Sequence, residues 1–453
     1  MSEGAAKKED KPRKFQAIRG TRDLLPPETA LWNRVEQTAH EVFETFGFGE
    51  IRPPIFEQTE LFARAVGGET DIVSKEMYTF TNPTSLAAVV REGRTEGMLS
   101  DMLLSEAEMI SLRPEATASA CRAYIEHNMQ QLPQPVKLYY TGPMFRRERP
   151  QKGRYRQFYQ IGAEVLGGSD APAIDAEVIE MVMTFFDRLG LQSVQLHINS
   201  IGDKNCRPKY VELLRQELRK VKDKLGPDSQ RRIETNPLRV LDSKLESEQE
   251  SIEKLPRIAQ HLCDSCRDNY DEVKRQLAIR GITYSQNFRL VRGLDYYMRT
   301  TFEITAQGLG SQNAVCGGGR YDGLVELLGG PPTKGIGFAI GEDRLILSLQ
   351  ESGKSPVQQG RDVYIAWMGE RAQATAIRAA KDLRKAGFSV ELPPVEQKFG
   401  KALGQADKLG AKYALILGDN EVFEGLWTLK TLADGSQAKF TEPDLLEHLK
   451  KHL

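Results

Sequence analysis

The sequence predicts an α+β protein with two folded domains, the larger of which carries a helical insertion. Strand and helix patterns alternate through residues 15–350, and charged helical patterns replace the strands over residues 206–282. A separate alternation of strands and helices, typical of a small α/β domain, fills residues 361–453. At 453 residues, the chain is long enough for more than one hydrophobic core.

Composition excludes several classes of protein. Hydrophobic residues at 40% and charged residues at 28% are ordinary for a soluble globular chain, and no apolar run reaches the ~18 residues that a membrane span needs. Residues 1–14 are charged and lack an apolar core, so we expect a disordered arm and no secretory signal. Five cysteines do not form a disulfide framework, which favours a reducing cytoplasm. The net charge of -1 means that any nucleic acid must bind a local patch.

The elements of the larger domain follow in order. Apolar residues at helical spacing predict a helix over residues 27–46, and the prolines of "EIRPPIFE" then favour a short extended piece. Residues 81–110 are expected to form a loop with a short helix. "VKLYYTGPMF" and "RQFYQIGAEVL" are rich in aromatic and β-branched residues and predict two strands. A helix over residues 174–189 and a strand at "SVQLHINS" come next.

The insertion and the C-terminal part differ in pattern. "YVELLRQELRKVKDKL" and "YDEVKRQLAIRG" have the charged, 3.6-residue period of exposed helices. Strand patterns resume at "FRLVRGLDYYMRTTFEITA", followed by the glycine-rich "CGGGRYDGL" and by "GIGFAIGEDRLILSL". Residues 351–360 have linker composition. We expect strand, helix, helix, strand and strand beyond them.

A basic tip separates the two aromatic-rich strands. Residues 137–156 contain seven basic residues and one acid. Arginine can bind phosphate through paired hydrogen bonds, Phe158 could stack on a purine, and Glu148 could accept from an adenine amino group. No G-x-x-x-x-G-K-[ST] loop exists, so side chains would have to hold the phosphates. The equally weighted alternative is a solvated basic hairpin, or one that contacts nucleic acid non-specifically.

This basic stretch resembles motif 2 of the class II aminoacyl-tRNA synthetases. "FGFGEIRPPIFEQTELFARAVG" is similar to their motif 1 and "GIGFAIGEDRLIL" to their motif 3. "LVRGLDYYMRTTFEI" and "AVCGGGRYDGLVELLGG" resemble the two signature peptides of histidyl-tRNA synthetases, and "IRGTRDLLP" and "SLRPEATAS" fit the same family. The resemblance covers roughly residues 15–450, with its motifs in the right order.

The resemblance implies a fold and a reaction. The fold is a class II catalytic domain, an antiparallel sheet flanked by helices, over residues 15–350, with an anticodon-binding domain over residues 361–453. In the reaction, L-histidine and ATP give histidyl-adenylate, and the histidyl group then moves to the 3′ end of tRNA(His). The family also implies a homodimer through motif 1. Mg²⁺ is expected with ATP, held largely by phosphates and water.

The resemblance assigns the ATP site and the catalytic cations. It implies that Arg146 binds the α-phosphate, that Glu148 and Phe158 contact adenine, and that Arg344 reaches the γ-phosphate. The alternative for Arg344 is an arginine on a helix surface. Arg292 and Arg146 are the catalytic candidates, because Arg292 would lie against the α-phosphate and the substrate carboxylate and stabilise charge at phosphorus. The alternative for Arg292 is a strand arginine paired with an acid such as Asp295.

The resemblance also implies a histidine pocket, formed by Glu115, Thr117, Gln160, Glu164, Arg292, Tyr296 and Tyr297. Buried carboxylates are costly unless a cation pairs with them, and the substrate can supply one. For each of these residues the alternative is a polar core group with its hydrogen bonds satisfied. The sequence departs from the family at Ala116, where glycine is usual, and in the length of the connection over residues 81–110.

The pair "CDSC" raises the question of a metal. Cys263 and Cys266 could ligate zinc with Cys206 as a third thiolate, but a closed structural site needs four ligands, usually two such pairs. His197 and His261 are only loosely near, and no HxxxH is present. We therefore predict thiols without a metal.

Two other functions are alternatives to the histidyl-tRNA synthetase reaction. A non-catalytic regulatory paralogue that accompanies ATP phosphoribosyltransferase predicts a broken signature at Arg292 and no anticodon domain, whereas both are present. A class II synthetase for another amino acid conflicts with the "RGLDYY" and "GGGRYDG" peptides. In the C-terminal domain, Lys398, Lys401 and Lys408 fit either RNA contacts or a solvated face.

Overall fold

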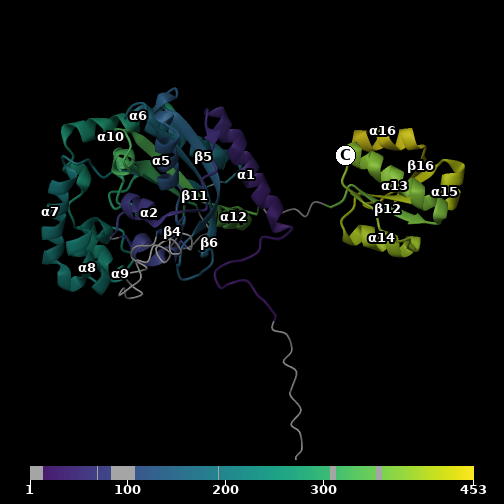
Figure 1. Cartoon of the computed structure of the whole chain (residues 1–453), viewed down its shortest axis with the longest axis horizontal. Coiled ribbons are helices and arrows are strands. Elements are labelled where there is room, and N and C mark those ends of the chain that lie inside the picture. Colours follow the sequence, from purple (N-terminus) through teal and green to yellow (C-terminus); the bar gives the residue numbers. More distant parts are fainter. Residues whose placement is uncertain are drawn as a thin grey trace, which may run out of the picture. The chain divides into compact units, whose positions relative to one another are not determined.

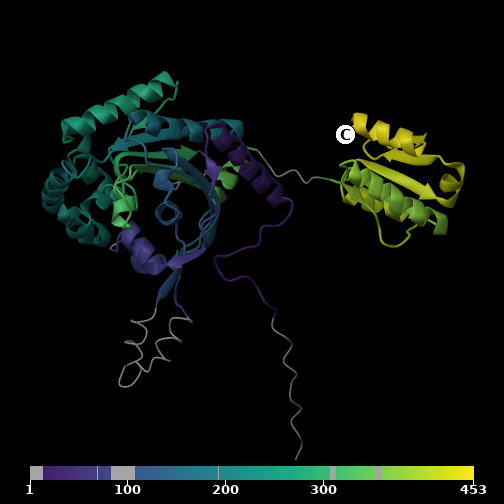
Figure 2. The same ribbon diagram turned by 45° about the horizontal axis from the view of Figure 1, so that its top comes forward.

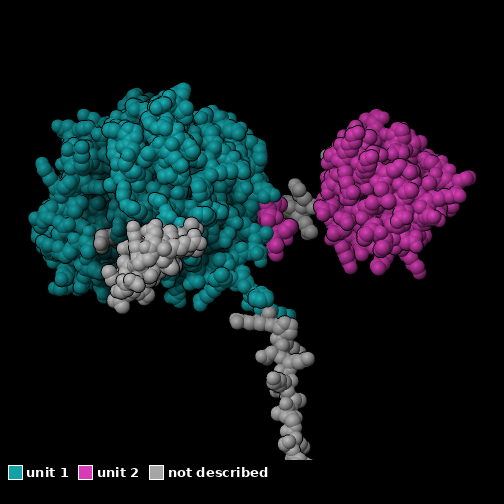
Figure 3. All heavy atoms as spheres, viewed as in Figure 1, with its two compact units in different colours: residues 1–24, 32–355 teal, residues 25–31, 356–453 magenta. Residues whose placement is uncertain are grey.

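The computed structural model describes residues 14–68, 70–82, 108–191, 193–306, 313–353 and 360–452. Almost all of the expected N-terminal arm, and most of the predicted loop and linker, therefore lie outside the described residues. The chain divides into two compact units, residues 1–24 with 32–355 and residues 25–31 with 356–453 (Figure 3).

The larger unit is built on an eight-stranded sheet in the order β1-β5-β6-β11-β10-β9-β7-β8. Helices lie around this sheet (Figure 1). Its strands are β1 (Gly49–Glu50), β5 (Val136–Phe145), β6 (Gln157–Leu166), β7 (Val194–Ser200), β8 (Ser285–Gln286), β9 (Met298–Ala306), β10 (Ala314–Arg320) and β11 (Gly335–Gly341). The pairs from β5 through to β7 are antiparallel, and the two outermost pairs are parallel. The predicted fold class, an antiparallel sheet with flanking helices, is confirmed.

The hairpin of β5 and β6 has the predicted position. Its register runs from Val136 opposite Leu166 to Phe145 opposite Gln157, so residues 146–156 form the basic tip. Because partners across an antiparallel pair share a face, Met144, Phe158, Gln160 and Glu164 all lie on one side of the sheet. Tyr139 and its neighbours at odd positions lie on the other.

Two helices cover the Tyr139 face, α1 (Glu28–Thr45) and α6 (Pro172–Arg188). Phe43 of α1 makes edge-to-face ring contacts with Tyr139, Phe185 and Phe338, which joins both helices to strands β5 and β11. Such pairs add about 0.5–1.5 kcal/mol beyond the area they bury. The helix predicted over residues 27–46 is thus found, and the core beneath it anchors one face of the sheet.

The opposite face is bordered by α2 (Thr59–Val66) and α5 (Thr117–Glu126), whose apolar residues pack with Leu166 and Tyr321. A three-stranded sheet of β2 (Phe56–Gln58), β4 (Met109–Leu112) and β3 (Thr79–Thr81) lies nearby in sequence. The last two strands occupy the ends of the predicted loop over residues 81–110, so that prediction is wrong at its ends. Between them, residues 83–107 lie outside the described part of the chain.

A buried ion pair fixes α6 to the sheet. Arg320 at the end of β10 donates from Nε and Nη2 to Asp175 in the first turn of α6, and both side chains are nearly inaccessible. Arg320 also donates to Asp322 at 2.9 Å.

We expect Asp175→Ala to lower the free energy of unfolding by about 2 kcal/mol. The loss stays below the ~3–5 kcal/mol of a buried charge left without any partner, because Arg320 keeps Asp322. Urea unfolding measures the change, and Asp187→Ala on the exposed side of the same helix is the control. Equal effects of the two substitutions would contradict the structural role of the pair.

The insertion leaves the sheet after β7 and returns at β8. It contains α7 (Arg207–Lys220), α8 (Pro227–Thr235), α9 (Glu246–Glu253) and α10 (Asp264–Ile279), which stand beside the sheet (Figures 1 and 2). Its apolar side chains, Tyr210 and Leu214 among them, form a cluster that includes Val291 and Tyr297 of the sheet domain. The predicted helical insertion is therefore packed against the segment that joins β8 to β9.

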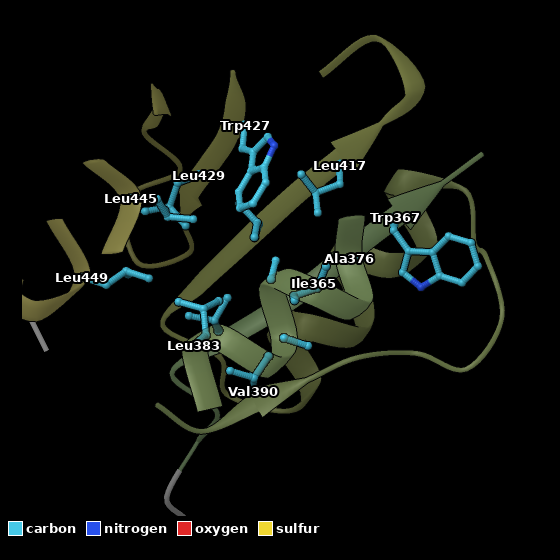
Figure 4. Packing of buried hydrophobic residues seen from close by; sticks show 14 of the residues in the cluster. Ile365, Trp367, Ala376, Leu383, Val390, Leu417, Trp427, Leu429, Leu445 and Leu449 are labelled. Carbon is cyan, nitrogen blue, oxygen red and sulfur yellow. The ribbon is translucent and has the colours of Figure 1, made fainter. Parts of the chain in front are cut away.

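The smaller unit has its own five-stranded sheet in the order β13-β12-β14-β15-β16. The strands are β12 (Val363–Met368), β13 (Val390–Glu391), β14 (Tyr413–Gly418), β15 (Trp427–Thr431) and β16 (Gln437–Phe440); the helices are α13 (Glu370–Lys385), α14 (Phe399–Lys408), α15 (Asp419–Glu424) and α16 (Glu442–His452). Ile365, Leu383, Leu417 and Leu449 point into one core between the sheet and its helices (Figure 4). The predicted α/β domain is found, and the strands β13 and β16 and the helices α15 and α16 add to the five predicted elements. No described helix is long and apolar enough to span a membrane.

Candidate active site

A polar cleft opens on the face of the large sheet that carries Phe158 and Gln160. Ten of the residues singled out from the sequence line it: Glu115, Thr117, Arg146, Glu148, Phe158, Gln160, Arg292, Tyr296, Tyr297 and Arg344. They come from β6, from the segment after β5, from the approach to β9, and from the starts of α5 and α12 (Glu342–Glu351). Arginines almost 200 residues apart in sequence therefore share one cavity.

At one end, Arg146 is held in place beside an aromatic ring. Its Nε donates to the carbonyl of Pro114 at 3.0 Å, and its Cζ lies 5.3 Å from the ring centroid of Phe158. The Glu148 carboxylate lies 3.3 Å from Arg154 and 3.9 Å from Arg146. The guanidinium is thus positioned before any ligand arrives, which reduces the entropy lost on binding an anion.

Arg344 lies in the first turn of α12 and faces the same cleft. Its Nη1 donates to the carbonyl of Ala314 at 3.0 Å. Burial lowers the pKa of Arg344, and the nearby guanidinium of Arg154 lowers it further. Cations gathered in this way favour a polyanionic ligand.

The side chain of Arg292 lies against the glycine-rich strand β10. Its Nη1 lies 3.2 Å from Glu303 Oε2, so its acidic partner is Glu303 and not Asp295, which instead accepts from Asn236. Burial opposes the charged form of Arg292, but the neighbouring Tyr297 and Glu303 raise its pKa overall. A Cβ on Gly317 would collide with Arg292 Nη2, so the guanidinium in this position needs glycine beneath it.

Two buried polar atoms in the cleft lack partners. Arg292 Nε and Gln160 Oε1 have no hydrogen-bond partner among the described residues. Buried polar groups in proteins are almost always paired, because an unpaired one costs about 1–3 kcal/mol. One donor and one acceptor left open in the same cleft indicate that a polar ligand completes them.

Glu115 presents a carboxylate at the start of α5. Its oxygens accept from the backbone N–H groups of Thr117 at 2.7 Å and Ala118 at 3.0 Å. The side chain is 4% exposed, and burial raises its pKa although these hydrogen bonds oppose the shift. A cation that enters the cleft would offset this cost.

Ala116, where the family usually has glycine, has φ −117°, which alanine adopts without strain.

Glu164 lies beneath the cleft and does not line it. Its carboxyl accepts from Thr117 Oγ1 at 2.7 Å and from the Tyr321 hydroxyl at 2.5 Å, and Tyr140 is 3.4 Å away. Burial raises its pKa from 4.5 to about 8. Of the predicted pocket residues, Glu164 alone does not line the cleft, and it contacts the lining residue Thr117.

The raised pKa of Glu164 has a consequence for stability. Between pH 4.5 and about 8 the folded chain holds a proton that the unfolded chain releases. The contribution of Glu164 to the free energy of unfolding therefore falls as pH rises through that window. We expect the stability advantage of wild type over Glu164→Gln in urea to be larger at pH 5 than at pH 8. Parallel pH curves for the two proteins would contradict the shift.

Sequence reasoning missed two acids that line the cleft. Glu303 interrupts the apolar alternation of β9 and pairs opposite Gly317 of β10. Asp343, next to Arg344, accepts from the backbone N–H of Tyr159 at 3.0 Å and from Arg22 at 3.2 Å. A charge inside a strand of apolar neighbours was a usable signal for Glu303, whereas Asp343 is indistinguishable from an ordinary helix-start acid.

An antiparallel sheet with helices on both faces, a basic β-hairpin and an arginine-lined cleft define a class II aminoacyl-tRNA synthetase. The comparisons with known proteins agree with this class. The family model described as histidyl-tRNA synthetase matches residues 99–345, and the one described as anticodon binding domain matches residues 362–452. The chain belongs to the histidyl-tRNA synthetase family.

Individual relatives match over nearly their whole length. A histidine–tRNA ligase from Solibacter usitatus is 52% identical over 96% of this chain and 99% of its own length. A histidine–tRNA ligase from Koribacter versatilis is 50% identical over 97% of this chain and 96% of its own length. The crystal structure of apo S. aureus histidyl-tRNA synthetase is 36% identical, with a TM-score of 0.76 over 96% of this chain and all of that one. These matches favour the ligase over the regulatory paralogue.

Proposed function

We propose that this chain is an ATP-dependent histidine–tRNA ligase whose first half-reaction takes place in the arginine-lined cleft. The substrate carboxylate attacks the α-phosphorus of ATP, forming histidyl-adenylate and releasing pyrophosphate. The 3′-terminal ribose hydroxyl of tRNA(His) then attacks the acyl carbon, so that the histidyl ester forms and AMP leaves. The convergence of Arg146, Arg292 and Arg344 on one cavity is the observation that carries this proposal.

The nucleotide would lie along the Phe158 face of the sheet. Phe158 supplies a ring for adenine, Glu148 an acceptor for its amino group, and Arg146 a cation for the α-phosphate. Arg344 would take the γ-phosphate at the far end. This arrangement holds triphosphate with side chains, in agreement with the missing glycine-rich phosphate loop.

The amino acid would lie between Glu115 and Arg292. Glu115 offers negative charge for the ammonium group, and Arg292 offers positive charge for the carboxylate and the α-phosphate. Gln160 Oε1 and the hydroxyls of Thr117, Tyr296 and Tyr297 provide polar contacts for the remaining atoms. A cleft that hydrogen-bonds an imidazole rejects apolar amino acids strongly, because its own polar groups would be left unpaired.

A magnesium ion would lie in the cleft beside the triphosphate. Mg²⁺ prefers oxygen ligands and usually keeps several waters. Glu303 is the acid whose position suits it, because it lines the cleft, is partly exposed and lies next to Arg292. When bound, the ion would neutralise phosphate charge.

The remaining assignments follow from the family. Residues 15–350 would form the catalytic domain and residues 361–453 the part that contacts the anticodon, with two chains forming a homodimer in the cytoplasm. Lys398, Lys401 and Lys408 are exposed at α14, which suits either RNA phosphates or a solvated face.

Pyrophosphate exchange with each of the twenty amino acids tests the proposal. Exchange should depend on histidine, and transfer should require tRNA(His). Exchange driven by another amino acid but not by histidine would overturn the specificity.

A further inference from the structure

Four side chains with metal-binding atoms meet where the insertion begins and ends. Asp203 and Cys206 lie in the connection from β7 to α7, and Cys263 and Cys266 lie at the start of α10. One ligand atom from each, three sulfurs and one carboxylate oxygen, lies within 4.8 Å of all the others. Three of the four residues are buried, and Cys263 is half-buried.

The spacing of these residues is that of a structural zinc site. Asp203 with Cys206 and Cys263 with Cys266 are two pairs, each separated by two residues. Tetrahedral zinc with Zn–S bonds of about 2.3 Å places neighbouring ligand atoms roughly 3.8 Å apart, so the cluster has to contract by only about 1 Å. Three thiolates and one carboxylate are a donor set that suits zinc.

Neighbouring groups already orient the carboxylate. Asp203 Oδ1 accepts from the backbone N–H groups of Asn205 at 2.9 Å and Cys206 at 3.3 Å. Arg299 Nη2 lies 4.0 Å from Asp203 Oδ2. Four anionic ligands around a divalent cation leave excess negative charge, which a nearby guanidinium offsets, and such outer groups are typical of protein metal sites.

The contacts among the four residues are weak without a metal. Cys206 Sγ lies 3.5 Å from Asp203 Oδ1, and Cys263 Sγ lies 3.9 Å from the same atom. A redox-active dithiol is the main rival, because a C-x-x-C pair at a helix N-terminus favours thiolate. That chemistry uses two sulfurs and gives no role to Cys206 or Asp203.

We propose that Asp203, Cys206, Cys263 and Cys266 bind one zinc ion that joins the start of α7 to the start of α10. Each thiol would give up its proton on binding and become a thiolate ligand. The ion would hold together the first and last helices of the insertion. Sequence reasoning rejected a metal because it counted only thiolates and histidines, and the fourth donor is an aspartate 60 residues from the "CDSC" pair.

Zinc content of the full, tag-free chain tests the proposal. Protein from zinc-supplemented cells, dialysed against metal-free buffer, should contain about one zinc per chain by elemental analysis. The double variant Cys263→Ser with Cys266→Ser should contain only background zinc. Asp203→Ala should lose zinc to a chelator faster than wild type, whereas Asp203→Cys should retain it. Cys121→Ala, which removes a buried thiol elsewhere, is the matched control and should keep one zinc.

A second measurement does not depend on the folding of the variants. Apo wild-type protein titrated with Co²⁺ should develop thiolate-to-cobalt absorption that saturates at about one ion per chain. Background zinc in wild type together with no cobalt absorption would overturn the proposal. A mass decrease of two hydrogens in unreduced protein, mapped to Cys263 and Cys266, would replace it with the dithiol.

Discussion

An Arg292→His variant should form histidyl-adenylate about 10²–10³-fold more slowly than wild type while still binding ATP, the scale for removing one fixed electrostatic stabiliser. Arg292 is held by Glu303, which lines the same cleft, so its charge is in place before the reaction begins. Negative charge moves onto the α-phosphate oxygens during attack, and a preorganised cation stabilises that charge more in the transition state than in the bound substrates. Single-turnover mixing of enzyme, ATP and histidine measures the rate.

The control for this experiment is Arg188→His. Arg188 is exposed at the end of α6 and does not line the cleft, so its replacement should leave the rate within about 2-fold of wild type. An Arg292→His rate close to that of the control would remove Arg292 from the chemistry. If Arg292→His instead bound ATP more weakly but kept the wild-type single-turnover rate at saturating ATP, the role of Arg292 would be in binding and not in catalysis.

The parts of the fold that sequence predicted well are those with local patterns. Strand β5 was predicted at its observed bounds, and β6 began within one residue, because aromatic and β-branched residues continue through both strands. Three of the four arginines that line the cleft, Arg146, Arg292 and Arg344, were predicted because family motifs carry them, whereas Arg154 was not.

What sequence reasoning missed depends on pairing between distant segments. Glu303 reaches the cleft because the register of β9 against β10 places it opposite Gly317, where the absence of a side chain leaves room for Arg292. Glu164 shares a face with Gln160, yet Tyr321 and Thr117 close over its carboxyl. No local pattern encodes a register or a covering side chain, so these differences become visible only in three dimensions.

Asp203 shows the same limit for the proposed zinc site. An aspartate three residues before Cys206 has the sequence context of an ordinary turn residue, and its Oδ1 does accept nearby backbone N–H groups. Only the packing of α10 near the end of β7 brings the "CDSC" pair within reach of it. The spacing of residues in the sequence alone cannot distinguish Asp203 as a turn residue from Asp203 as a metal ligand.

A Glu115→Gln variant should raise the KM for histidine about 100-fold and leave the KM for ATP nearly unchanged. The carboxylate is almost fully buried and is held by two backbone N–H groups, so it cannot move away from a bound ammonium. Removing one partner of a buried charge pair costs about 2–5 kcal/mol, of which glutamine recovers a part through its remaining hydrogen bonds. Steady-state pyrophosphate exchange, with each substrate varied in turn, separates the two constants.

Glu126→Gln provides the matched control, because Glu126 ends the same helix α5 but faces solvent beside Arg122. It should shift neither KM, since exposed ion pairs contribute at most about 1 kcal/mol. The role of Glu115 is decided by whether Glu115→Gln raises the KM for histidine alone or the KM for both substrates. If Glu115→Gln weakened ATP and histidine equally, the carboxylate would be supporting the start of α5 as a whole, and the ammonium would have to bind elsewhere in the cleft.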